Sequence, residues 1–240
     1  MPRPGLIHKY HARVLLNLTG ACAIHCRYCF RRHFPYPDAS THGAMTDEIM
    51  DYLTEHNEVA EVILSGGDPL MLSDQKLAGL IEQLNQLSHI RLLRIHSRLL
   101  SVLPQRVTAE LLEVLENFNG QLVFVTHINH PREIDDRNQA AFSRLHHRGH
   151  RLLNQSVLLH KVNDRADILA SLSYRLFASH IMPYYLHQLD KVQGAAHFDL
   201  PAEKICILYR QLQNQLPGYL LPRLVQEIPG QLAKTPVHCG

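Results

Sequence analysis

Short apolar runs alternate with longer segments of helical spacing along most of the chain. The first run covers residues 13–18, and further runs cover residues 61–65, 92–96, 122–126, 151–155 and 182–186. Between them, apolar positions recur at helical spacing over residues 74–87, 108–118, 137–149, 164–179 and 201–216, and a capping sequence near Thr46 begins a helix after the first run. β-rich runs separated by helices predict βα units and a parallel sheet.

Six βα units are too few for a complete eight-unit barrel. We therefore expect an α/β fold in which six parallel strands form a partial, TIM-like barrel. A doubly wound open sheet is the alternative that periodicity leaves open. Both folds bind ligands at the carboxyl ends of the strands, so polar residues just after each strand are the candidates for function. With 240 residues and no Gly/Ser-rich linker, one domain is expected.

Three cysteines stand directly after the first strand. Cys22, Cys26 and Cys29 have the spacing CxxxCxxC, with an aromatic residue just before the third. Three thiolates are one short of the four that close most iron–sulfur or zinc sites, so a cluster held by three would leave one iron open to a ligand. A zinc site completed by His25 or His33, and three ordinary buried thiols, are the other interpretations.

Charge and composition narrow the classes of function. Lys and Arg total 24 against 22 Asp and Glu, a net charge of +2, so no basic field indicates nucleic acid. The apolar runs are strand-sized, and no signal-peptide segment follows the N-terminus. Five cysteines, three of them in one motif, suit a reducing compartment, and we expect Cys206 to pack in a helix and Cys239 to lie in a loose tail. A soluble cytoplasmic protein is predicted.

Polar clusters follow the later strands. After the second strand comes SGGDPL, residues 65–70, in which the glycines permit a sharp turn close to a ligand and Asp68 offers an acceptor. The next strands end in HSR at 96–98, THINH at 126–130, NQS at 154–156 and HQLD at 187–190. Any one of these clusters could simply cap a loop, but their recurrence predicts a polar ligand bed.

Taken together, the motifs resemble the lysine 2,3-aminomutase family of radical S-adenosylmethionine enzymes, most closely the branch that serves (R)-β-lysylation of elongation factor P. The resemblance runs from about Pro4 to Pro236 and rests on HKYHARVLL, CAIHCRYCFRRHFPY, SGGDPL, RIHSR, NQSVLL, PYYLHQLDKVQGAAHF and GYLLPRLVQEIPGQLAKTP. It implies a single radical S-adenosylmethionine barrel domain, a partial (β/α)6 barrel over residues 1–240, with a cofactor-binding C-terminal segment from about 217 to 240. The N-terminal region that family members usually carry is expected to be absent.

The resemblance implies an isomerase that converts L-lysine to (R)-β-lysine, which a separate ligase would attach to elongation factor P. Its cofactors would be a [4Fe–4S] cluster, S-adenosylmethionine and pyridoxal 5′-phosphate, and a flavodoxin- or ferredoxin-type protein would supply electrons. An aminomutase for another amino acid, or a non-catalytic iron–sulfur or zinc-binding paralogue, is the alternative function.

The resemblance also implies a role for each matching residue. The cluster would be held by Cys22, Cys26 and Cys29, and S-adenosylmethionine by Ser65, Gly66, Gly67 and Asp68. Lys234 would be the catalytic lysine that binds pyridoxal phosphate as a Schiff base. The substrate carboxylate would be clamped by Arg31 and its ε-ammonium by Asp190 and Glu227, where the free-lysine enzymes have Asp in place of Glu227. The weaker candidates for the phosphate of the pyridoxal cofactor are Lys9, Arg13, Asn154, Gln155 and Ser156.

Overall fold

The structure is a computed structural model that describes residues 1–35, 40–41 and 43–239. Within these residues, nine strands form one sheet in the order of the sequence. The strands are β1 (Leu6–Tyr10), β2 (Arg13–Thr19), β3 (Glu61–Gly66), β4 (Leu92–Ser97), β5 (Gln121–Thr126), β6 (Arg151–Val157), β7 (Ile181–His187), β8 (Arg223–Gln226) and β9 (Thr235–Pro236). Strands β2 to β8 pair in parallel, whereas β1 and β9 pair antiparallel at the two edges.

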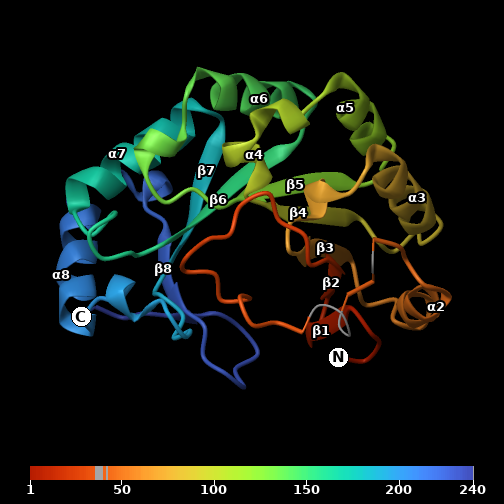
Figure 1. The fold of residues 1–240 in the computed structure, drawn as a ribbon, viewed down its shortest axis with the longest axis horizontal. Coiled ribbons are helices and arrows are strands. Elements are labelled where there is room, and N and C mark those ends of the chain that lie inside the picture. The colour runs from red at the N-terminus through yellow and green to blue at the C-terminus, as the bar shows by residue number, and fades with distance from the viewer. Residues whose placement is uncertain (36–39, 42, 240) are drawn as a thin grey trace.

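Helices cover the convex side of the curved sheet, and the barrel stays open between β1 and the C-terminal segment (Figure 1). The α-helices are α2 (Asp47–Glu55), α3 (Asp74–Asn85), α4 (Leu99–Val102), α5 (Ala109–Glu116), α6 (Asp136–His147), α7 (Ala166–Ala178) and α8 (Ala202–Gln213). Short 3₁₀ turns are η1 (Pro69–Met71), η2 (Pro104–Arg106), η3 (Pro131–Glu133), η4 (Ala196–Phe198) and η5 (Gly218–Leu220). No helix in the described ranges is long and apolar enough to cross a membrane.

The strands alternate between a helix-packed face and a concave face. On β2, Val14, Leu16 and Leu18 are buried in the main core with the helices. Because successive side chains of a strand point to opposite faces, Arg13, Leu15 and Asn17 point to the concave side. The same parity holds on the neighbouring strands, so the apolar core lies between sheet and helices and a polar set lines the concave side.

The partial barrel and its six predicted parallel strands are confirmed. The predicted helices also form, each ending within a few residues of the expected position. The pattern of apolar residues did not predict the strands at the two edges of the sheet, β1, β8 and β9, because they are short. With β8, the sheet has seven parallel strands rather than six. Tyr36, which ends the CAIHCRYCFRRHFPY segment, lies outside the described residues.

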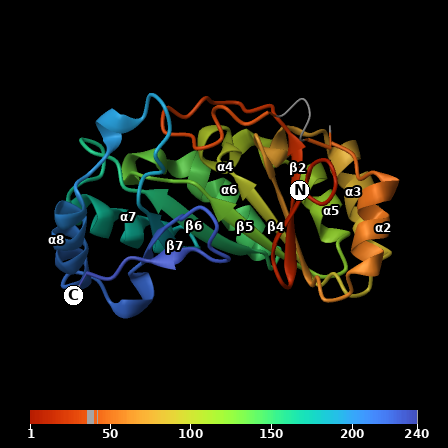
Figure 2. The same ribbon diagram turned by 90° about the horizontal axis from the view of Figure 1, so that it is seen from below.

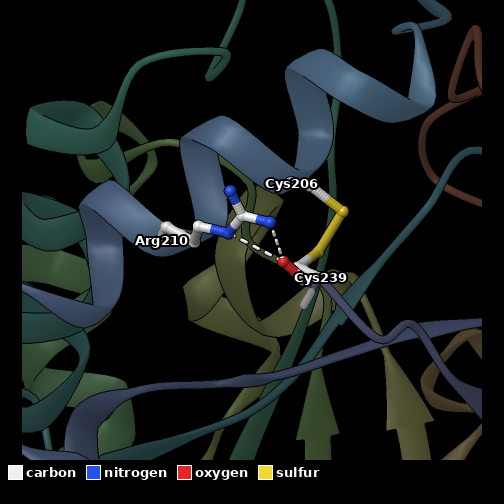
Figure 3. The surroundings of a disulfide bond; sticks show 3 residues. All are labelled: Cys206, Arg210 and Cys239. Carbon is white, nitrogen blue, oxygen red and sulfur yellow. Dashed lines mark hydrogen bonds between the residues drawn. A yellow bond between two sulfur atoms is a disulfide. The ribbon is translucent and has the colours of Figure 1, made fainter.

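The C-terminal segment is fastened to α8, contrary to the expected loose tail. A disulfide joins Cys206 of α8 to Cys239, and the backbone oxygen of Cys239 also accepts hydrogen bonds from Nε (2.7 Å) and Nη2 of Arg210 (Figure 3). Sequence spacing could not reveal this pair, because 33 residues separate the two cysteines. The segment also pairs with β8 through β9, so residues just before β9 are held near the end of the sheet.

Candidate active site

The concave side carries polar groups that the protein itself does not satisfy. Within the described residues, Nε of Arg13, Nδ2 of Asn17 and Nε2 of both His96 and His187 are buried without a hydrogen-bond partner. Buried polar atoms are normally paired, so a group of orphans on one face indicates a place for ligands or water. These orphans come from β2, β4 and β7, far apart in the sequence.

Uncharged imidazoles occupy the middle of this side. The rings of His96 and His127 lie 5.8 Å apart, and the amide nitrogen of Gln155 is 3.4 Å from Nδ1 of His96 and 3.3 Å from Nδ1 of His127. Burial lowers the pKa of His127 to about 3, and the charges of Arg98, Lys234 and Arg31 add to the effect. Burial lowers the pKa of His96 as well, again with Lys234 and Arg31 contributing. The rings are therefore neutral near pH 7.

A lysine and two carboxylates gather at the end of β8. Glu227 follows this strand and accepts hydrogen bonds from Nζ of Lys9 at 2.9 Å and of Lys234 at 3.3 Å. Burial acts to raise the pKa of Glu227, but the Lys9 hydrogen bond and the Lys234 charge outweigh it and lower the pKa. At Asp190 burial wins and raises the pKa, against the Lys234 charge and together with that of Glu227. Lys234, Glu227 and Asp190 thus lie close enough to act on one another.

Lys234 lies close to this group because β9 begins at the next residue. Its Nζ lies 5.7 Å from the ring of Tyr185, on β7. Burial raises the pKa of Tyr185 to about 12, and its hydroxyl accepts a hydrogen bond from that of Tyr184 at 3.0 Å. Lys9, a predicted phosphate ligand, is paired with Glu227 instead.

Arg31 joins the concave side from the cysteine segment. Its Nη1 donates to the side-chain oxygen of Asn17, and its guanidinium lies 5.3 Å and 5.6 Å from the rings of Phe30 and Phe34. The Arg31 charge also contributes to the lowered pKa of His96 and His127, and its bond to Asn17 places the guanidinium on the concave side with them. A planar fork of donors in that position suits a carboxylate.

The cysteine segment crosses the open mouth of the barrel (Figures 1 and 2). Tyr28 anchors it there through side-chain hydrogen bonds. The buried Tyr28 hydroxyl accepts from Nδ2 of Asn129 at 2.6 Å and from Arg98, and Arg98 also pairs with Glu133 at 2.9 Å. This anchor was not predicted, although the aromatic position of the motif was a signal for it. It places the thiols of the segment above the polar side of the sheet.

The three thiols are near one another without forming a closed ligand set. Burial raises the pKa of Cys22 to about 11, helped by the charges of Asp68, Cys29 and Cys26. Burial also raises the pKa of Cys26, with Cys29 adding to it. Within the described ranges, no three His, Cys, Asp or Glu side chains converge on a metal position. Three soft donors on one segment fit an iron–sulfur cluster that completes the site when it binds.

The SGGDPL turn supports this segment from below. A side chain at Gly67 would meet the backbone oxygen of Ala21 at 2.3 Å, and one at Gly66, whose φ is +125°, would meet that of Thr19 at 2.5 Å. The glycines therefore allow the end of β3 to pack against the backbone that leads into Cys22. Ser65 lies on the concave side beside Asn17 in the sheet.

Asp68 has a structural role that the sequence did not reveal. Its buried carboxylate accepts hydrogen bonds from the Ser97 hydroxyl at 2.8 Å and from the backbone N–H groups of Arg98 and Leu99 at 2.8 and 2.9 Å. It also accepts from Leu70 N at 3.1 Å. This arrangement does not favour the prediction that the carboxylate holds an amino group, since its oxygens already have partners.

The NQS cluster divides between the two faces. Gln155 points to the imidazoles, but Asn154 and Ser156 are buried on the helix side. Asn154 accepts from Ile128 N at 2.8 Å, and Ser156 donates to Ile128 O at 2.7 Å. Both side chains hydrogen-bond the backbone just after β5. These bonds argue against their predicted role as phosphate ligands. Arg13 is 3.9 Å from Glu61 and stacks over Tyr10 at 4.0 Å, so the structure gives it local partners.

Comparison with known proteins places these residues in context. Residues 16–166 match the model of the radical SAM superfamily. A protein of Escherichia coli K12 named L-lysine 2,3-aminomutase is 49% identical over 234 residues, which are 98% of this chain and 68% of that protein. A protein of Clostridium subterminale with the same name is 39% identical over 237 residues, 98% of this chain and 57% of that protein.

Solved structures share the fold at low sequence identity. Streptococcus suis SuiB bound to S-adenosylmethionine superposes with a TM-score of 0.61 at 14% identity, covering 89% of this chain and 51% of SuiB. A radical SAM methyltransferase from Sphaerobacter thermophilus gives 0.59 at 14% identity, covering 89% of this chain and 66% of the methyltransferase. Both agree with the partial barrel fold.

Proposed function

The chain belongs to the lysine 2,3-aminomutase family of the radical S-adenosylmethionine superfamily, and we propose that it moves the α-amino group of L-lysine to the β carbon with pyridoxal 5′-phosphate held by Lys234. The carrying observation is the grouping of Lys234, Glu227 and Asp190 on the side of the sheet that Arg31 also faces. We propose that this sheet and its helices form one catalytic domain, with the pyridoxal lysine in the segment from about 217 to 240.

In the proposed complex, groups of opposite charge bind the two ends of lysine. Arg31 would bind the carboxylate through its planar fork, and Glu227 with Asp190 would bind the distal ammonium. The neutral rings of His96 and His127 can hydrogen-bond without adding positive charge that would compete for the carboxylate. Holding both ends of a flexible substrate removes most of its orientational freedom before reaction.

Glu227 must change partners for this to work. In the structure it holds the ammonium groups of Lys9 and Lys234. Lys234 cannot keep its ammonium contact with Oε2 of Glu227 while it binds a pyridoxal carbonyl, so loading of the cofactor would free Oε2 for the substrate ammonium, with Lys9 remaining on Oε1. Two acids near the distal end favour lysine over glutamate, because a distal carboxylate would be repelled.

The bound cofactors would supply what side chains cannot: the cluster and S-adenosylmethionine a carbon-centred radical, and pyridoxal a carrier for the migrating amino group. Cys22, Cys26 and Cys29 would hold the cluster, and the protein would supply orientation and exclusion of water. Orphaned donors of Arg13, Asn17, His96 and His187 fit a side of the sheet built to be filled by such ligands. A reductant protein must deliver the electron. We further propose that the product is (R)-β-lysine for attachment to elongation factor P, on the sequence resemblance alone.

The test uses anaerobic protein reconstituted with iron and sulfide, then supplied with pyridoxal phosphate, S-adenosylmethionine, dithionite and L-lysine. Chiral chromatography should detect (R)-β-lysine, and Cys26→Ala and Lys234→Ala should abolish it. Lys204→Ala, which removes a surface lysine paired with Asp164, is the matched control and should retain activity. Wild-type protein that holds its cluster and pyridoxal yet yields no β-lysine would refute the proposal, and product from glutamate would identify the other aminomutase class.

A further inference from the structure

We propose that Asn17 is a positioning and specificity residue that aims Arg31 at the substrate carboxylate and offers its own free N–H to the same anion. This inference rests on the proposed function for the role of Arg31, but Asn17 itself lies outside the stretches that carry the family resemblance, between HKYHARVLL and CAIHCRYCFRRHFPY. It is a buried amide within an otherwise apolar strand, VLLNL.

The position of Asn17 is rigid. The residue is 0% exposed, and its backbone is fixed by a bond from its N–H to Gly5 O and another from Thr41 N–H to its carbonyl, both 2.8 Å. Its side chain lies on the concave parity of β2, opposite to the core residues Leu16 and Leu18. An apolar residue would be expected at such a position unless the amide has a task, because a buried polar group costs free energy when it is not fully bonded.

Chemistry fixes which way the amide points. A guanidinium has only donors, so the atom of Asn17 that receives Nη1 of Arg31 must be the oxygen. The amide nitrogen then points elsewhere, and it is buried with no partner among the described residues. It is a preset donor beside a guanidinium.

The guanidinium of Arg31 is confined from two directions. Asn17 holds it on the strand side, and Phe30 and Phe34 lie 5.3 Å and 5.6 Å away within its own segment. Apart from the Asn17 bond, its side chain makes no hydrogen bond or ion pair within residues 1–35, 40–41 and 43–239, so most of its five N–H donors are open. Arg31 and the neighbouring Asn17 amide together present N–H donors that have no acceptor among the described residues, which is the chemistry of a carboxylate site.

The experiment compares binding of L-lysine with binding of L-lysinamide, in which a neutral amide replaces the carboxylate. Both dissociation constants are measured by calorimetry on full-length protein loaded with pyridoxal phosphate and S-adenosylmethionine, without reductant. Asn17→Leu should weaken lysine binding about 10-fold or more, because a hydrogen bond to a charged group is lost. Binding of lysinamide should change by less than about twofold.

A second variant gives an opposite signature. Asn17→Asp keeps the oxygen that Arg31 uses and should fold even if the leucine variant does not. Its carboxylate would neutralise Arg31 and repel that of lysine, so lysine binding should fall while lysinamide binding holds or improves. Asn163→Leu is the matched control: this buried amide bonds only backbone groups, so its loss should lower the melting temperature without changing the lysine-to-lysinamide ratio.

If both Asn17 variants bound lysine and lysinamide more weakly by the same factor, the proposal would be overturned and Asn17 would be a structural residue. Wild-type protein that forms β-lysine but does not prefer lysine over lysinamide would overturn it too, while the proposed reaction stands. If the preference exists and collapses in the Asn17 variants although no β-lysine is formed, the carboxylate site is supported and the proposed reaction fails.

Discussion

Reducing the Cys206–Cys239 disulfide should lower stability and loosen the segment that carries Lys234. The bond ties α8 to the residues that follow β9, and β9 begins one residue after Lys234. Without the bond, this segment is held by the Arg210 contacts to Cys239 O, by β9 pairing and by a bond from Val237 N to Leu224 O at 3.1 Å.

The size of the effect follows from the loop that the bond closes. For a separation of 33 residues, chain entropy gives about 3.7 kcal/mol of stabilisation at 25 °C. For a chain of 240 residues, each kcal/mol corresponds to roughly 2–4 °C in melting temperature, so full loss corresponds to about 7–15 °C. This is an upper value, because residual structure in the unfolded chain reduces the gain.

The melting temperatures of oxidised and thiol-reduced protein measure the loss of stability. The affinity for pyridoxal phosphate measures how far the segment that carries Lys234 is loosened. Cys206→Ser should melt like reduced wild type and show no response to reductant, which separates the disulfide from the three thiols near the barrel mouth. Reduced protein should also bind pyridoxal phosphate more weakly. Identical melting temperatures for oxidised, reduced and variant protein would refute the reasoning.

Three further changes test other parts of the structure. Burial and nearby cations hold the pKa of His127 and His187 at about 3, so the unfolded chain takes up their protons from about pH 6.5 downward and the folded one does not. The free energy of unfolding should therefore fall as pH decreases from 6.5 toward 3, by up to about 1.4 kcal/mol per unit and ring, and a urea midpoint that is the same at pH 7 and 5 would contradict this. Asp68→Ala strands several buried donors and should cost about 2–3 kcal/mol in urea unfolding, against little change for a surface Asp167→Ala. Tyr28→Phe removes the anchor of the cysteine segment, and iron content after reconstitution should drop while the free energy of unfolding, measured in urea, falls by about 1–3 kcal/mol.

The central strands and helices could be predicted from the sequence because they are long enough to show a clear strand or helix periodicity. Strands β2 to β7 are each six or seven residues of apolar character, and apart from the four-residue α4 the helices that follow them have eight to thirteen residues. The exceptions are short. Strand β8 has four residues between Pro222 and Glu227, and β9 has two, so neither shows a period. Their pairing depends on tertiary contacts that no local pattern records.

Motifs that fix both chemistry and position led to residues whose proposed roles the arrangement supports, whereas polarity alone led to residues that the structure gives protein partners instead. The cysteines and Lys234, which lies beside Glu227, belong to the first kind as proposals. Asn154, Ser156 and Asp68 belong to the second, because a polar residue at a strand end can bond a neighbouring strand as well as a ligand. Polarity alone does not distinguish these two uses.

Strand parity does distinguish them. On β6, Asn154 and Ser156 share the parity of the core residue Leu152, whereas Gln155 has the other and reaches the imidazoles. On β4, Ser97 shares the core parity and bonds Asp68, whereas His96 faces the concave side. Polar residues of core parity thus join strand ends to one another, and those of opposite parity lie on the concave side. By this rule the amide of Asn17 belongs with His96 and Gln155 on the concave side, and its N–H, which has no partner among the described residues, is the basis of the proposed carboxylate site.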